Sequence, residues 1–144
     1  IPTQPELGSV HGVSKAITRL KTARERGATA RLLGVLPVML RRTHEHSANM
    51  AELVRMLEPE TWDEYEVALT HVGEDSQLPI ERFLLDKHHQ GHVGTLLSPI
   101  SQSTVWPETP AYQTTIFNYV SPRNKAYRSA ERLIDQVEMK LHQG

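Results

Sequence analysis

The first third of the chain changes from extended to helical spacing of its apolar residues. The opening segment, residues 1–6 ("IPTQPE"), predicts the end of a strand. Its two prolines cannot donate to a sheet ladder, so the segment cannot continue as a central strand. Apolar residues then recur at helical spacing, with Ser9 as the expected cap and Gly27 as the expected terminator. The apolar face of this predicted helix consists of Val10, Val13, Ile17 and Leu20.

A short, almost wholly apolar run follows at residues 30–40 ("ARLLGVLPVML"), and it predicts a strand buried on both faces of a parallel sheet. Gly34 and Pro37 argue against a helix in this run. The polar stretch 41–49 ("RRTHEHSAN") is expected to be a loop, and residues 50–58 ("MAELVRMLE") a helix. The apolar side of that helix consists of Met50, Leu53, Val54 and Leu57.

The second half of the chain predicts two short helices, at residues 60–70 and 79–87, with "GEDSQ" between them. Residues 92–97 ("HVGTLL") predict another short buried strand, and the proline-punctuated stretch after it is expected to be a rigid loop. A closing helix follows, with Ser121 as its cap and Pro122 in its first turn. Its apolar face consists of Ala126, Tyr127, Ala130, Leu133, Ile134, Val137 and Leu141.

Alternating strands and helices predict one α/β unit over residues 1–144, with parallel strands joined by right-handed crossovers. No apolar run approaches the roughly 18 residues that cross a bilayer, so no membrane association is expected. The absence of cysteine excludes disulfides and thiolate metal sites. The chain starts at Ile1 with strand-like apolar character and no methionine, which indicates part of a longer protein.

Charge is unevenly distributed, although the net charge is only −1. Residues 1–50 carry eight Lys or Arg against three Glu, whereas residues 51–90 carry three Lys or Arg against ten Asp or Glu. A basic opening third beside an acidic middle can present one face to a polyanion. The alternative interpretation is that these charges are solvated helix faces.

The chemical motifs of common enzyme classes are missing. No G-x-x-x-x-G-K-[ST] phosphate loop, G-x-G-x-x-G turn or G-x-S-x-G elbow occurs. The histidines of "HHQGH" lack the helical H-E-x-x-H spacing, so a solvated turn is preferred to a metal site. The sequence therefore gives no support for three kinds of chemical role. These are metal ligands (His44, His46, His88, His89 and His92), nucleophiles (Ser98, Ser101 and Ser103) and acid–base groups (Asp63, Glu64 and Glu66).

Basic side chains near the predicted strand ends indicate a binding function more strongly than the histidine, serine and carboxylate groups do. Arg41 and Arg42 follow the strand at 30–40, at the edge where open α/β sheets bind ligands. Arg123, Lys125 and Arg128 occupy the first turns of the closing helix, and Lys87 and His88 are expected to act with them. Together they predict salt-sensitive, sequence-independent attraction to nucleic acid phosphates. The alternative is that each is a surface charge without a ligand.

The order of these motifs resembles the C-terminal half of ParA-type partition ATPases, which are deviant-Walker P-loop proteins related to the Soj and MinD groups. The resemblance spans almost the whole chain apart from the acidic stretch around residues 59–90, and depends on the order of motifs that are individually unspecific. It departs from the family pattern at "SPIS" and at "ETPAYQTTI". The matching positions are Pro2, Gln4 and Glu6; Gly34, Val35, Leu36, Arg42 and Thr43; and Pro99, Ser101, Glu108, Ile116, Tyr119, Pro122, Ala126 and Ala130.

The resemblance implies part of a P-loop NTPase-type, mostly parallel sheet flanked by helices. It implies adenine-side contacts from Pro37, Val38, Pro99 and Ile100. It also implies contacts to non-specific DNA from Arg41, Arg42, Arg123 and Lys125. In family members the phosphate-binding lysines, the magnesium ligand and the Walker B aspartate lie upstream of the "P-x-Q" segment, so this chain alone is expected to be inactive.

The intact protein is then expected to be a Mg²⁺-dependent ATPase that forms a homodimer around ATP and holds DNA. A centromere-binding, ParB-like partner would stimulate hydrolysis, and the protein would be cytoplasmic and associated with the nucleoid. Two alternatives stay open. One is a MinD-like regulatory ATPase, disfavoured because the last residues, "DQVEMKLHQG", have little basic character. The other is a non-enzymatic α/β module that binds DNA or protein.

Overall fold

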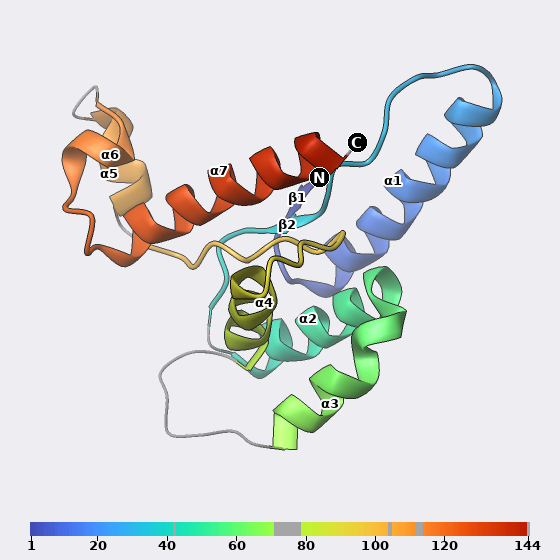
Figure 1. Cartoon of the computed structure of the whole chain (residues 1–144), viewed down its shortest axis with the longest axis horizontal. Coiled ribbons are helices and arrows are strands. Elements are labelled where there is room, and N and C mark those ends of the chain that lie inside the picture. The colour runs from blue at the N-terminus through green and yellow to red at the C-terminus, as the bar shows by residue number, and fades with distance from the viewer. Residues whose placement is uncertain (42, 71–78, 104, 112–113, 144) are drawn as a thin grey trace.

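The computed structural model describes residues 1–41, 43–70, 79–103, 105–111 and 114–143 (Figure 1). The chain is mostly helical, and short extended segments cross its centre. In order, the elements are β1 (Pro2–Thr3), α1 (Leu7–Glu25), β2 (Leu36–Pro37), α2 (His44–Leu57), the 3-10 turn η1 (Pro59–Thr61), α3 (Trp62–Thr70), α4 (Pro79–His89), α5 (Val105–Ala111), α6 (Ile116–Tyr119) and α7 (Lys125–Gln143).

The expected P-loop NTPase-type, mostly parallel sheet is wrong for this chain. In the described residues the sheet has two strands, β1 and β2, paired in parallel with Pro2 opposite Leu36 and Thr3 opposite Pro37. The run at 92–97, expected to be a strand, forms none. The physical reason is the proline content of the extended segments: Pro2, Pro37 and Pro99 have no N–H to donate, so no long ladder forms.

A third extended segment, residues 95–102, nevertheless lies beside β2 in the same direction. Isolated parallel bridges join Val35 to Leu96 and Leu40 to Ser101. Residues other than the prolines form backbone hydrogen bonds between the two segments, and the Leu97 N–H, for example, donates to the Val35 carbonyl at 2.9 Å. The carboxyl ends of β2 and of this segment therefore come to the same edge.

Helices cover both sides of these extended segments, with α7 on one side and α2, α3 and α4 on the other (Figure 1). The main core lies with α2, α3 and α4, where Met50, Leu53 and Val54 have no exposed surface. Fully burying such side chains stabilises the fold by about 1.5–3 kcal/mol each. The core cluster consists of Leu40, Met50, Leu53, Val54, Tyr65, Leu84 and Leu96.

Several helix ends differ from the sequence prediction. Helix α2 begins at His44 rather than Met50, because the Thr43 side chain caps it by accepting from the His46 N–H at 3.1 Å. Ser9 lies inside α1 and is not its cap. Gly27, with φ of 101°, is confirmed as the residue that ends α1. The predicted break "GEDSQ" lies outside the described residues.

The proline-punctuated stretch contains two short helices, α5 and α6, so its prediction as a loop is wrong. Helix α5 packs against α6, and α6 packs against the start of α7, where the Phe117 and Tyr127 rings meet edge to face with centroids 5.0 Å apart. The Tyr119 hydroxyl donates to the Glu108 carboxylate at 2.9 Å. Helix α7 begins at Lys125, and the Asn124 side chain accepts from the Ala126 N–H, so Ser121 and Pro122 precede the helix.

Candidate nucleotide-base pocket

A cavity of about 430 Å³ lies at the shared carboxyl edge of β2 and the 95–102 segment. Its wall is mostly apolar. This size falls within the range of about 300–1,000 Å³ that is typical of small-molecule sites. The lining residues are Val38, Met39, Ile100, Ser101, Gln102, Ser103, Trp106 and Pro107.

An unusual turn after β2 brings Met39 to the pocket. Met39 has a φ of 54°, the left-handed region that residues other than glycine rarely adopt. Its side chain is 47% exposed, and its sulfur accepts from the Gln4 side-chain amide at 2.8 Å. The residue that shapes this wall is therefore held from the β1 side as well as by its own backbone.

The next turn residue, Arg41, is fixed by two groups. Its backbone N–H donates to Nδ1 of the buried His46 at 3.0 Å, and its guanidinium lies 4.0 Å from the Glu6 carboxylate. Both groups of the ion pair are about half exposed, so the pair contributes little to stability. The hydrogen bond to His46, which is partly buried, is the stronger constraint on this turn.

The opposite wall comes from the chain between the 95–102 segment and α5. Ile100 contributes an apolar side chain, and Trp106 contributes an indole ring from the first turn of α5. Ser101, Gln102 and Ser103 add hydroxyl and amide groups along the same wall. An aromatic ring with aliphatic groups and a few polar atoms suits a flat heterocycle with a polar edge.

The predicted adenine-side residues divide into two pairs. Val38 and Ile100 line the pocket. Pro37 and Pro99 are buried in the extended segments and are not among its lining residues. The sequence analysis did not identify Met39, Gln102, Trp106 and Pro107 as pocket residues. The pair Trp106–Pro107, which places an indole in the proline-punctuated stretch, was the sequence feature that could have indicated this wall.

The predicted DNA-contacting residues are not all brought together. Arg123 and Lys125 lie exposed at the start of α7, where the Arg123 N–H donates to the Ser121 hydroxyl. Arg41 is exposed in the turn after β2. Arg42 lies outside the described residues.

The histidines take part in separate interactions. His88 Nε2 lies 2.9 Å from the Asp135 carboxylate and links α4 to α7, whereas His46 contacts the Arg41 backbone. Among the described residues no three His, Cys, Asp or Glu side chains are arranged to hold a metal ion.

No helix in the described part of the chain is long and apolar enough to cross a membrane. Comparisons of the chain with protein-family models, with curated proteins and with solved structures give no match.

Proposed function

We propose that this chain forms the base-binding side of the ATP site in a ParA-type partition ATPase. One observation carries the proposal: the pocket is lined by Val38 and Ile100, two of the four residues that the resemblance assigns to the adenine. It also lies beyond the carboxyl ends of parallel segments, where ligands bind in parallel α/β proteins. The proposal depends on the pocket and on the order of motifs, and it does not require a complete sheet.

The pocket suits adenine chemically. A purine is flat and largely apolar on its faces, so burial against Val38, Ile100 and Trp106 removes apolar surface from water. Its ring nitrogens and amino group need hydrogen-bond partners, and Ser101 and Gln102 lie in the same wall. Among the described residues no charged side chain lines the pocket, and this apolar lining fits a neutral base better than a phosphate group.

The phosphates and Mg²⁺ of ATP need other groups. Phosphoryl transfer requires backbone amides, a lysine and metal ions that neutralise charge as it develops. The sequence contains no phosphate-binding loop, so these groups would come from outside this sequence. We therefore expect base recognition from this chain and no hydrolysis by it alone.

The same proposal covers the partners. The parent protein would dimerise around ATP, hold non-specific DNA and respond to a centromere-binding, ParB-like protein, in the cytoplasm and on the nucleoid. Exposed cations at the start of α7 and in the turn after β2 support attraction to DNA phosphates. The order of motifs from "PTQPE" to "SPRNKA" supports the choice of family.

The base-binding proposal is tested by fluorescence. The chain has two tryptophans, so Trp62→Phe leaves Trp106 as the only indole reporter. Adenosine should change Trp106 emission with a dissociation constant on the order of 1 mM, because the phosphate contacts are missing. Ile100→Lys should abolish the change, since it places a charge in the apolar wall.

A matched control separates the pocket from the rest of the surface. Leu141 is 66% exposed on α7 and does not line the pocket, so Leu141→Lys should leave the adenosine response unchanged. An emission change that persists in Ile100→Lys, or no change in the parent variant, contradicts the proposal.

A further inference from the structure

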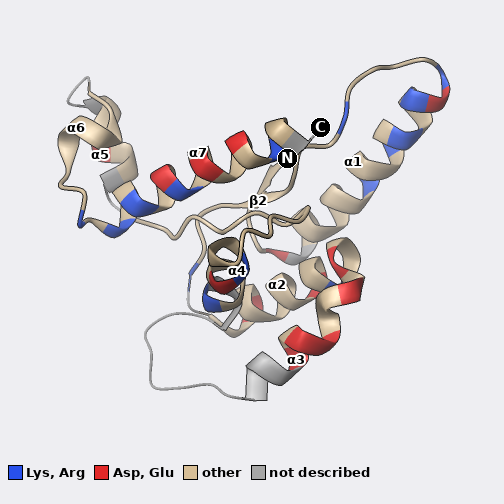
Figure 2. Cartoon of the chain, viewed as in Figure 1, with Lys and Arg blue, Asp and Glu red and all other residues tan. Residues whose placement is uncertain are grey.

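The distal part of α1 and the loop after it carry a concentration of positive charge that the pocket does not explain. We use the name basic arm for residues 15–31, which contain six Lys or Arg and a single carboxylate, Glu25. All six cations are exposed. Figure 2 shows basic residues along the outer part of α1 and in the loop that follows it, whereas the acidic residues of α3 lie elsewhere. The cations are Lys15, Arg19, Lys21, Arg24, Arg26 and Arg31.

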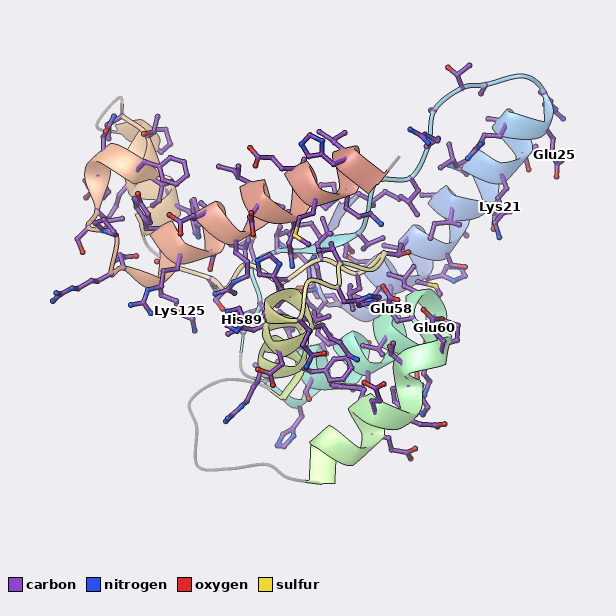
Figure 3. All side chains as sticks on the ribbon, viewed as in Figure 1. Lys21, Glu25, Glu58, Glu60, His89 and Lys125 are labelled. Atoms are coloured by element: carbon purple, nitrogen blue, oxygen red, sulfur yellow. The ribbon has the colours of Figure 1, made fainter. Side chains whose placement is uncertain are left out.

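The outer part of the arm projects because the partly buried residues of α1 end at Leu20. Val13 is 2% exposed, and Val10 packs against the main core cluster. Beyond Leu20 every residue from 21 to 31 is exposed. Figure 3 shows Lys21 and Glu25 on this outer part of the helix. A helix that extends past its last packing contact presents its side chains to a partner on several faces.

The cations of the arm are not paired with a carboxylate in the part of the chain that the structure describes. Across the described residues none of the six takes part in an ion pair, whereas Arg41, Arg55 and Lys87 each lie beside a carboxylate. Lys15 and Arg19 are also four residues apart, a spacing at which like charges destabilise a helix by roughly 0.2–0.5 kcal/mol. A polyanion bound here would remove this repulsion.

The spacing of the cations makes a continuous stripe. Lys15 and Arg19 lie on α1, and Arg26, the residue that caps its C-terminus, follows seven positions later, a spacing that keeps the three on the side of α1 opposite the buried Val13. At about 1.5 Å per residue the stripe is roughly 16 Å long. An α-helix about 10–12 Å wide fits the major groove of B-DNA, and a stripe of this length reaches several phosphates.

The chemistry of the arm favours a duplex over other polyanions. A membrane-surface helix needs large apolar side chains directed at the bilayer, but the exposed residues 21–31 offer only alanine as apolar surface. Single-stranded nucleic acids are bound through aromatic stacking, and the chain has no Phe, Tyr or Trp before Trp62. The deep, narrow major groove of duplex RNA does not admit a helix.

We propose that the basic arm of α1 is a phosphate-binding surface for duplex DNA, distinct from Arg41, Arg123 and Lys125. It rests on the DNA-binding part of the proposed function and places that contact on an element to which the resemblance assigns none. The contacts are with the backbone, so binding does not depend on base sequence.

The test is the salt dependence of duplex binding by the full 144-residue chain. Fluorescence anisotropy with a labelled DNA duplex is measured across a salt series for the wild type and for Lys15→Gln/Arg19→Gln/Arg26→Gln. The triple variant should lose about tenfold in affinity or more at moderate salt, and its log–log salt slope should fall by about 2–3. A control with the same net charge, Arg55→Gln/Arg82→Gln/Lys140→Gln, should keep the wild-type slope.

Each other outcome overturns the inference in a recognisable way. If both triple variants lose affinity equally, net charge alone is responsible and the arm is not the surface. If wild-type protein binds vesicles rich in phosphatidylserine but not the DNA duplex, the partner is a membrane. If adenosine binds and the duplex does not, the proposal for the basic arm is wrong and the proposal for the pocket is retained. If neither binds, the proposed function is wrong as well. Circular dichroism of each variant identifies any loss of folding.

Discussion

The backbone N–H of Arg41 donates to Nδ1 of His46 at 3.0 Å, and this bond ties the turn after β2 to the first turn of α2. The His46 side chain is 2% exposed. Because Nδ1 accepts, the neutral imidazole carries its proton on Nε2, which has no partner among the described residues. The bond holds the turn immediately after Met39, so a histidine outside the pocket positions one of its walls.

Two substitutions at His46 separate this hydrogen bond from packing. His46→Leu leaves the Arg41 N–H without its acceptor and should lower the free energy of unfolding by about 1–3 kcal/mol. His46→Asn places an amide oxygen near the position of Nδ1 and should retain most of that stability. Urea denaturation measures the stability, and Trp106 emission with adenosine measures the pocket wall. Equal losses in the two variants would show that the acceptor is unimportant.

The helical part of the fold was largely predictable from the sequence. Apolar residues at helical spacing located α1 and α7, and Gly27 was recognised as a terminator because glycine accepts positive φ at low cost. The start of α2 was missed because "RRTHEHSAN" is polar apart from Ala48. Its helical conformation depends on the Thr43 cap and on burial of His46, and a burial partner distant in sequence does not appear in local periodicity.

The extended part and the pocket were harder to predict. Apolar runs such as "LLGVLPVML" do form extended segments, but the predicted strand ladder was too long. Pro37 and Pro99 have no backbone N–H, so each removes a hydrogen-bond donor from the ladder. Val38 and Ile100 were selected by resemblance. Met39 could not be selected, because its place in the wall follows from a left-handed backbone conformation that its side chain does not favour.

Glu58 and Gly94 form a second tightly coupled pair. Glu58 is 7% exposed, and its Oε1 accepts from the Leu96 N–H at 2.9 Å. A Cβ on Gly94 would lie 2.1 Å from that same oxygen. We therefore expect Gly94→Ala to displace the carboxylate and to destabilise the chain by about 1–3 kcal/mol through overpacking and loss of the bond.

A double-mutant cycle tests this coupling. Glu58→Ala removes the obstructing carboxylate, so adding Gly94→Ala to it should cost clearly less than Gly94→Ala alone, with an interaction energy of about 1 kcal/mol or more. Thermal denaturation of the four proteins supplies the values. Additive effects would mean that the glycine is required for another reason.

Gln136 joins α7 to the 95–102 segment through two hydrogen bonds with Ser98. Its Oε1 accepts from the Ser98 N–H at 3.0 Å, and its Nε2 donates to the Ser98 hydroxyl at 2.8 Å. Gln136 is 2% exposed, so the amide is a polar link within the interface beneath α7. Gln136→Leu keeps the approximate volume but leaves the Ser98 N–H unsatisfied, and should cost about 1–3 kcal/mol.

Exchange of individual amides detects the loss of this link. In Gln136→Leu, hydrogen exchange of the Ser98 amide should accelerate by roughly ten- to hundredfold, in proportion to the lost stability. Leu141→Ala, on the exposed part of the same helix, is the control and should leave that amide unchanged. Undiminished protection in Gln136→Leu would mean that other contacts hold α7 in place.

Tyr65 makes the stability of the chain sensitive to alkaline pH. Its side chain is fully buried between the Trp62 and Phe83 rings, and burial raises its pKa from 10.0 to about 12. Below about pH 10 the hydroxyl is neutral in both states, and between about pH 10 and 12 only the unfolded state ionises. Stability should therefore fall across that interval, by about 2–3 kcal/mol from this residue.

Tyr65→Phe isolates this contribution, because the Tyr65 hydroxyl has no hydrogen-bond partner among the described residues. Near neutral pH the variant should be as stable as the wild type or more stable by about 1 kcal/mol, since a buried unsatisfied group is removed. By about pH 11 it should have lost measurably less stability than the wild type, because no phenol at this position can ionise on unfolding. Urea denaturation at both pH values gives the comparison, and parallel losses in the two proteins would assign the alkaline sensitivity to other groups.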